Sequence, residues 1–254
     1  MTLRNELHPE HIYRVLEQTL IPPVSVQELD PDIIESAVTR LSSTSGSPSE
    51  SYLVNSEFTA ADLKRLPSAQ EAQNIRNYFF STTVEGFEKS LETRWARNWS
   101  PNEPLGQLLS PAWTNPVVAQ GLFGVDLLVL FEDQLWRQIP SKPGAIFEQN
   151  VPSNFAEQVA AQLHDSSQDL SHGPLLILVG SHVRVQFTHG VQATRAMMQS
   201  AGMVIGALTN QALSLHMRPS IISHFNNSAL NRLVSADGVD RAVATIFAAT
   251  VADT

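Results

Sequence analysis

The chain has 254 residues, a formal net charge of −9 and no cysteine. This length is enough to bury a substantial core, and the lack of cysteine excludes a disulfide framework, an iron–sulfur cluster and Cys-ligated zinc. The 16 basic against 25 acidic residues argue against an electrostatic grip on DNA or RNA. Charged residues make up 16% of the chain, against about 25% in an average domain. This low share indicates that another chain covers part of the surface.

The apolar runs of the sequence are short. The longest cover 125–131, 175–179 and 203–208, and none reaches the roughly 18 residues that a membrane-spanning helix needs. The first residues also lack the apolar core of a signal peptide. We therefore expect a cytoplasmic protein that binds neither nucleic acid nor a membrane.

Two short helices and a linker are predicted at the N-terminus. Apolar residues recur at helical spacing over 8–20 and 31–41. The following stretch, 42–51, consists almost entirely of Ser, Thr, Gly and Pro, a composition typical of flexible linkers. We therefore divide the chain into an N-terminal helical segment (1–42), a flexible linker (43–57) and a main domain (58–254).

The main domain mixes helical and strand patterns. The helical patterns cover 59–66, a stretch from Thr82 or Thr83 through Trp95, 153–163 and 227–233. Short apolar or alternating runs predict strands over 125–131, 145–148, 175–179, 183–187, 220–225 and 241–248. Helices and strands that interleave in this way predict an α+β or α/β fold with one sheet covered by helices.

A long apolar segment runs from Gly190 to Met217 without a proline. A helix over this range would be about twice as long as the mean globular helix of about 11–12 residues. Apolar residues cover much of its circumference, which is typical of a buried central helix. Gly202 and Gly206 are four residues apart, so one face permits a close backbone approach. We interpret this segment as core or as the seam of a homodimer, with a ligand-facing surface as the alternative.

Tryptophan and arginine gather shortly before the first buried strand. Trp95, Trp99 and Trp113 lie within 19 residues, with Arg94 and Arg97 beside them. Trp95 and Trp99 are four apart and would share one face of a helix. Because Trp and Arg are enriched at binding hot spots, this group is a candidate wall of a peptide groove. Core packing by the same helix is the alternative.

The order of elements after residue 116 resembles the C-terminal half of nitroreductase-like flavoproteins. It is more closely similar to the azoline dehydrogenases of ribosomal-peptide (RiPP) pathways. The likeness covers 116–248 and implies an α+β nitroreductase-like sheet covered by helices, a long central helix and a homodimer. It is carried by PVVAQGLFGVDLLVL (116–130), the segment 188–217, ISHFNNSALNRLVSADG (222–238) and AVATIFA (242–248). Within these segments the residues that fit the family pattern are Arg195, Gly202, Ser223–Phe225, Leu233 and Asp237–Gly238.

Four features that support the FMN cofactor of this family are missing together. The resemblance implies a Lys–Tyr pair for proton transfer before the central helix, where this sequence has Thr188 and His189. The Arg-rich stretch with its Ser-Gly-Gly turn, the Gln–Asn pair on the central helix and the paired arginines of an early motif are also absent. We therefore interpret the chain as a degenerate, flavin-less member. Arg195 is retained, although an arginine at that position can equally serve in an ion pair.

The resemblance thus implies a cofactor-free peptide-binding protein, similar to those of crocagin-type biosynthesis. Such a protein would hold a precursor peptide during RiPP biosynthesis and present it to a modifying enzyme of the pathway. The peptide-binding candidates are Trp95, Trp99, Trp113, His189 and Arg195.

Two other functions are compatible with the sequence. The chain could be an FMN-dependent azoline or peptide dehydrogenase with atypical flavin ligands. It could also be a cofactor-free catalyst with His189 as general base, because an unperturbed imidazole has a pKa near 6.5. No metal site is expected, since the pair His8 and His11 has no third ligand in the sequence.

Overall fold

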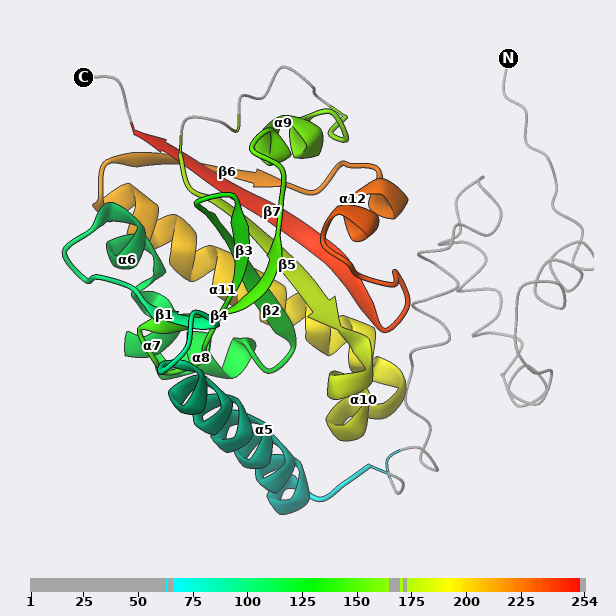
Figure 1. The fold of residues 1–254 in the computed structure, drawn as a ribbon. Coiled ribbons are helices and arrows are strands. Elements are labelled where there is room, and N and C mark those ends of the chain that lie inside the picture. Colours follow the sequence, from blue (N-terminus) through cyan, green and yellow to red (C-terminus); the bar gives the residue numbers. More distant parts are fainter. Residues whose placement is uncertain (1–62, 64–65, 165–169, 171–172, 252–254) are drawn as a thin grey trace, which may run out of the picture. The chain divides into compact units, whose positions relative to one another are not determined.

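The computed structural model describes residues 63, 66–164, 170 and 173–251 (Figure 1). The predicted N-terminal helices, the linker and most of the helix predicted at 59–66 lie outside these residues. The chain divides into two compact units, Met1–Leu63 and Lys64–Thr254, and the architecture below belongs to the second.

The second unit is built on one sheet of seven strands in the order β1-β4-β3-β2-β5-β7-β6 (Figure 1). Every neighbouring pair of strands is antiparallel. The strands are β1 (Ala96–Asn98), β2 (Val125–Phe131), β3 (Gln134–Gln138), β4 (Gly144–Asn150), β5 (Leu175–Ser181), β6 (Met217–Ile222) and β7 (Arg241–Val251).

Helices cover both faces of this sheet. Alternate residues of β2 and β5 point to opposite faces, and both strands are buried and apolar on both faces except at Asp126 of β2. On one face, β2 and β5 pack against α11 (Ala193–Ser214), α6 (Pro104–Leu109) and α8 (Pro116–Gly121). Helix α7 (Pro111–Thr114) connects α6 to α8. On the other face, the same two strands pack against α9 (Phe155–Ala160) and α12 (Asn227–Leu233).

The remaining helices lie at one end of the sheet. Helix α5 (Ala69–Ser90) begins with a capping box, in which Ser68 and Glu71 bond reciprocally. Helix α10 (His182–His189) follows β5 directly and leads through the short 3-10 helix η1 (Gly190–Gln192) into α11. In Figure 1 both α5 and α10 lie below the sheet, where β5 ends. They frame the polar network described in the next section.

Much of the predicted secondary structure is confirmed. The strands predicted at 125–131 and 175–179, the short strand at 145–148 and the helix at 227–233 are present. The long central helix is present as α11, although it begins three residues later and ends at Ser214. Among the described residues, no helix is long and apolar enough to cross a membrane.

The strand predicted at 183–187 is wrong, because this segment is the helix α10. Its alternating Val183, Val185 and Phe187 were compatible with a strand. In the helix Val185 turns into the core, while Val183 and Phe187, four residues apart, stand exposed. His182 and His189 lie at the two ends of this helix.

The helix predicted from Thr82 or Thr83 through Trp95 is also wrong in its bounds. It begins at Ala69 and ends at Ser90, and Trp95 precedes the short strand β1 while Trp99 follows it. The two tryptophans therefore share no helix face. The strand β3 was not predicted, because its hairpin turn is formed by Glu132 and Asp133 at φ of 51° and 57° and not by the usual Asn-Gly.

Candidate functional site

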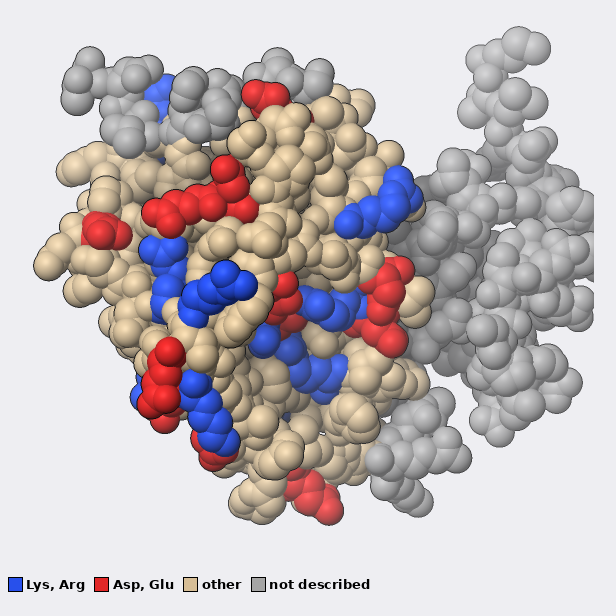
Figure 2. All heavy atoms as spheres, viewed as in Figure 1, with Lys and Arg blue, Asp and Glu red and all other residues tan. Residues whose placement is uncertain are grey.

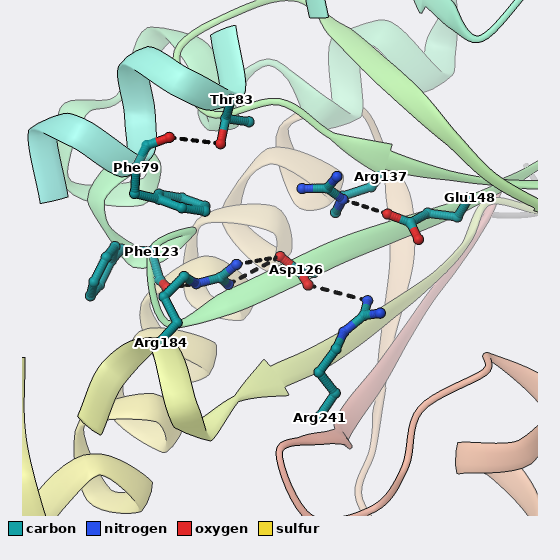
Figure 3. A network of polar contacts seen from close by, with 8 residues as sticks. All are labelled: Phe79, Thr83, Phe123, Asp126, Arg137, Glu148, Arg184 and Arg241. Atoms are coloured by element: carbon teal, nitrogen blue, oxygen red, sulfur yellow. Dashed lines mark hydrogen bonds and ion pairs between the residues drawn. The ribbon is translucent and has the colours of Figure 1, made fainter. Parts of the chain in front are cut away.

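A buried carboxylate organises the end of the sheet beside α5 and α10 (Figure 3). Asp126, the second residue of β2, is only 7% exposed. Its Oδ1 accepts hydrogen bonds of 3.0 Å from both Nη1 and Nη2 of Arg184, and its Oδ2 accepts one of 3.3 Å from Nη2 of Arg241. These residues come from the beginnings of β2, α10 and β7, which the antiparallel pairing places side by side.

A third arginine completes the group, which we call the arginine cluster (Arg137, Arg184 and Arg241 around Asp126). Arg137 on β3 donates through Nε to Oε1 of Glu148 on β4. Burial alone would raise the pKa of Asp126, but the charges of Arg184, Arg137 and Arg241 together hold it below its usual value. Asp126 is therefore ionised at neutral pH, and the burial of its charge depends on these arginines.

Aromatic rings form one wall of the arginine cluster. The guanidinium of Arg184 lies 4.5 Å from the ring centroid of Phe79 on α5, and its Nε donates to the carbonyl oxygen of Phe123. Phe79 and Phe123 meet edge to face, with centroids 5.5 Å apart. On the same helix, the Thr83 hydroxyl donates to the carbonyl of Phe79 (Figure 3). The wall fixes Arg184 by stacking as well as by hydrogen bonds.

His189, the predicted general base, ends the same helix as Arg184. The hydroxyl of buried Thr188 donates to the Val185 carbonyl at 3.0 Å and lies 2.7 Å from Nδ1 of His189. Because that hydroxyl proton is already used, we assign the proton of this contact to Nδ1 of His189, which leaves Nε2 as an acceptor. Burial lowers the pKa of His189 below 6.5 and the charge of Arg76 lowers it further, against the opposing effect of the Val185 carbonyl.

Replacing Arg76 by Gln should raise the pKa of His189, because it removes a like charge. The titration of the His189 ring protons by NMR measures this shift, with exposed Arg232→Gln as the control. Since the folded-state pKa of His189 is lowered, its neutral form favours folding above pH 6.5, and this contribution is lost as the pH falls through the lowered value. Arg76→Gln should therefore make the protein less sensitive to mild acid, and an unchanged His189 titration would contradict the assignment.

The three tryptophans occupy different environments. Trp95 is 46% exposed and lies on Phe147 of β4, with ring centroids 5.0 Å apart. Trp99 is only 4% exposed, and its Nε1 donates to Oε1 of Gln138 at 2.7 Å. Trp113 is partly buried against the same core. Of the three side chains, Trp95 is the one with the exposure that peptide binding requires, and the role of all three in binding stays a prediction.

The face of α11 that carries Gly202 and Gly206 is open in the single chain. A Cβ atom at either glycine would meet nothing within 4 Å. This face borders a hollow of about 510 Å³ between α11 and the helices α7 and α8, lined by polar and aliphatic groups that include Asn115, Val117, Met203, Asn210 and Gln211. Arg195 lies on the first turn of the same helix, half-buried and engaged with neighbouring groups.

Comparisons with known proteins identify the fold. No protein-family model and no curated protein matches the chain, but solved structures do. The Escherichia coli microcin synthetase McbBCD complex with truncated pro-MccB17 bound matches with a TM-score of 0.51 at 9% identity, over 63% of this chain and 68% of that one. The chain has a nitroreductase-like fold.

Two further matches are described as nitroreductases. A putative nitroreductase from Ralstonia eutropha gives a TM-score of 0.47 at 17% identity, over 64% of this chain and 79% of that one. A putative nitroreductase from Anabaena variabilis gives 0.44 at 16% identity over 52% of this chain, which spans only 28% of that protein's length. The fold implied by the sequence resemblance, an α+β nitroreductase-like sheet covered by helices, is confirmed.

Three hollows among the described residues lack the cationic side chains that would suit the phosphate of the FMN that this fold implies. A phosphate group carries nearly two negative charges at neutral pH and needs cationic partners or backbone donors. The hollow along α11 has no Lys or Arg in its lining, and neither do the hollows at 162–164 with 223–227 and at 66–75. The arginine cluster lies outside the linings of these three hollows. We therefore derive no step through a flavin.

The arginine cluster is absent from the sequence-based candidates. Arg184 and Arg241 are 58 and 115 residues away from Asp126 in the chain, so no local motif brings them together. One signal was present, because Asp126 is the single acidic residue in the buried strand VDLLVLF, and a buried charge requires partners. Among the described residues, no group of His, Asp and Glu could hold a metal ion.

Proposed function

We propose that this chain is a cofactor-free peptide-binding protein that holds a precursor peptide during ribosomal-peptide biosynthesis. The observation that carries the proposal is the arginine cluster with its aromatic wall. Its guanidinium groups are half-buried on an otherwise acidic chain. Figure 2 shows Lys and Arg side chains gathered with a few carboxylates near the middle of one face. Such a combination of arginine and aromatic groups is typical of binding hot spots.

The fold supports the same function. A structure with this fold, the microcin synthetase complex, holds a truncated pro-peptide, so the architecture is compatible with peptide handling. Among the described strands, β1 and β6 lie at the two edges of the sheet, which is where an extended peptide can add as a strand. The hollows among the described residues, whose linings contain no Lys or Arg, favour binding without FMN over a flavin-dependent dehydrogenase.

Calorimetry with the purified full-length chain tests this function. The probe is the synthetic precursor peptide encoded closest to the gene of this chain, and we expect saturable binding without added cofactor. The absorbance of the protein is recorded after incubation with FMN and desalting. Retention of the flavin bands would favour the alternative, an FMN-dependent azoline or peptide dehydrogenase, and no binding at high micromolar peptide would contradict the proposal.

We further propose that the chain acts as a homodimer, with the open face of α11 as the seam. Exposed Met203 and Val117 border the two open glycines, so this face is apolar and allows a close approach. Gly202→Leu should convert the dimer to a monomer in light-scattering measurements, whereas Gly86→Leu, at an equally open glycine on α5, should not. A wild-type chain that is monomeric at micromolar concentration would contradict this part of the proposal.

A further inference from the structure

The outer end of one guanidinium in the arginine cluster is unused. Nε of Arg137 donates to Glu148, but Nη1 and Nη2 have no hydrogen-bond partner among the described residues. Figure 3 shows these two nitrogens turned away from Glu148. They point into the space between Asp126 on β2 and helix α5, which carries Phe79 and Thr83. The Arg137 side chain is 25% exposed, so a ligand can reach it from solvent.

The charges around this space leave a positive excess. Three arginines, Arg137, Arg184 and Arg241, face two carboxylates, Asp126 and Glu148. Arg76 on α5 acts on His189 at the end of α10 and has no carboxylate partner among the described residues, while Asp237 offsets part of the charge of Arg241. One more anion can therefore be bound here at a favourable electrostatic energy, on a chain whose net charge is −9.

The geometry of the site selects among anions. The two free Nη groups of one guanidinium form a planar fork, which matches the two oxygens of a carboxylate. A peptide carboxylate carries one negative charge, which equals the excess of the three arginines over Asp126 and Glu148. The wall of Phe79 and Phe123 excludes water from one side, which strengthens a charge-assisted hydrogen bond.

We infer that Arg137 binds a carboxylate of the peptide, an Asp or Glu side chain or the C-terminal carboxyl group, through Nη1 and Nη2. This inference rests on the proposed peptide-binding function and names the chemistry that the peptide must supply. The partner is therefore an acidic peptide segment, and Arg137 sets the specificity for it.

Selection from a random dodecapeptide library on the immobilised full-length chain tests this inference separately from the function. We expect an enriched family of peptides with one fixed Asp, Glu or terminal carboxylate. No enriched peptide at all would contradict the peptide-binding function itself. Enriched peptides without a fixed acidic position would leave the function standing and overturn the role of Arg137.

Variants then assign the contact, with the dissociation constant of an enriched peptide measured by fluorescence anisotropy. Arg137→Gln should weaken binding about 10- to 100-fold, and the same loss should follow when the acidic residue of the peptide becomes its amide. Arg137→Lys, which keeps the charge and loses the fork, should fall between. Exposed Arg232→Gln on α12, which changes the net charge equally, should bind like the wild type.

Glu148→Gln provides a test in the opposite direction that does not depend on the stability of the Arg137 variants. It removes the carboxylate that competes for Arg137, so it should strengthen binding of the acidic peptide and leave the amide peptide unaffected. Competition with inorganic phosphate and with FMN separates the possible anions. Displacement of the peptide by micromolar FMN, or an unchanged affinity in Arg137→Gln, would overturn the inference.

Discussion

Replacing Asp126 by Asn is expected to lower the free energy of unfolding by about 3–5 kcal/mol. The carboxylate is 7% exposed and accepts hydrogen bonds from both Arg184 and Arg241. The amide of Asn has nearly the same shape as the carboxylate but no negative charge. The guanidinium groups of Arg184 and Arg241 then face each other and Arg137 without the carboxylate that offsets their positive charges. The loss is large because the remaining charges are partly buried and cannot be fully solvated.

Urea denaturation at pH 7 measures this effect, and Asp240→Asn serves as the control at an exposed carboxylate three residues from the turn at Asp237. The control should change the free energy of unfolding by less than about 0.5 kcal/mol. The pKa of Asp126 is lowered in the folded state, so its contribution is present above the unfolded pKa of about 3.9 and is lost as the pH falls through the lower folded value. Asp126→Asn should therefore also reduce the acid sensitivity, and a loss below about 1 kcal/mol at pH 7 would contradict a structural role.

This network also connects stability to the proposed binding site. Arg184 and Arg241 bind the beginnings of α10 and β7 to β2, and together with Arg137 they keep Asp126 ionised. The free Nη groups of Arg137 are thus presented on a rigid sheet and not on a loop, which reduces the entropy lost when a carboxylate binds. Peptide affinity should depend on Arg137 directly and on Asp126 through the fold.

The sequence was sufficient for the parts of the fold that rest on local pattern. The buried strands β2 and β5 and the helix α11 were predicted because apolar runs and the absence of proline decide them locally. The segment of α10 was misassigned because its alternation fits both a strand and a helix, and only tertiary packing of Val185 decides between them.

The candidate site was predicted only in part, because the local sequence pattern does not show which distant residues meet in the fold. His189 was identified from its position before the central helix, and it ends the helix that carries Arg184. The arginine cluster was not predicted, because Asp126 meets Arg184 and Arg241 only after β2, β5 and β7 pair. The tryptophans were grouped by spacing alone, and the packing of the folded chain separates them.

That separation gives Trp95 and Trp99 opposite expected effects. Trp99→Ala should lower the free energy of unfolding by about 3–5 kcal/mol, because its ring fills the core beside Phe131 and Gln138 loses the donor for its buried Oε1. Trp95→Ala should change stability by less than about 1 kcal/mol, because the ring is 46% exposed and contacts chiefly Phe147.

Denaturation and peptide binding measured on both variants separate packing from recognition. Trp99→Phe is the milder control, since it keeps most of the core volume and removes the indole donor to Gln138. If Trp95 contacts the peptide, Trp95→Ala should weaken peptide binding while its unfolding curve stays close to that of the wild type. Weakened binding in Trp99→Ala has meaning only at temperatures where that variant is folded. A stable Trp99→Ala with impaired binding would restore Trp99 as part of the peptide site.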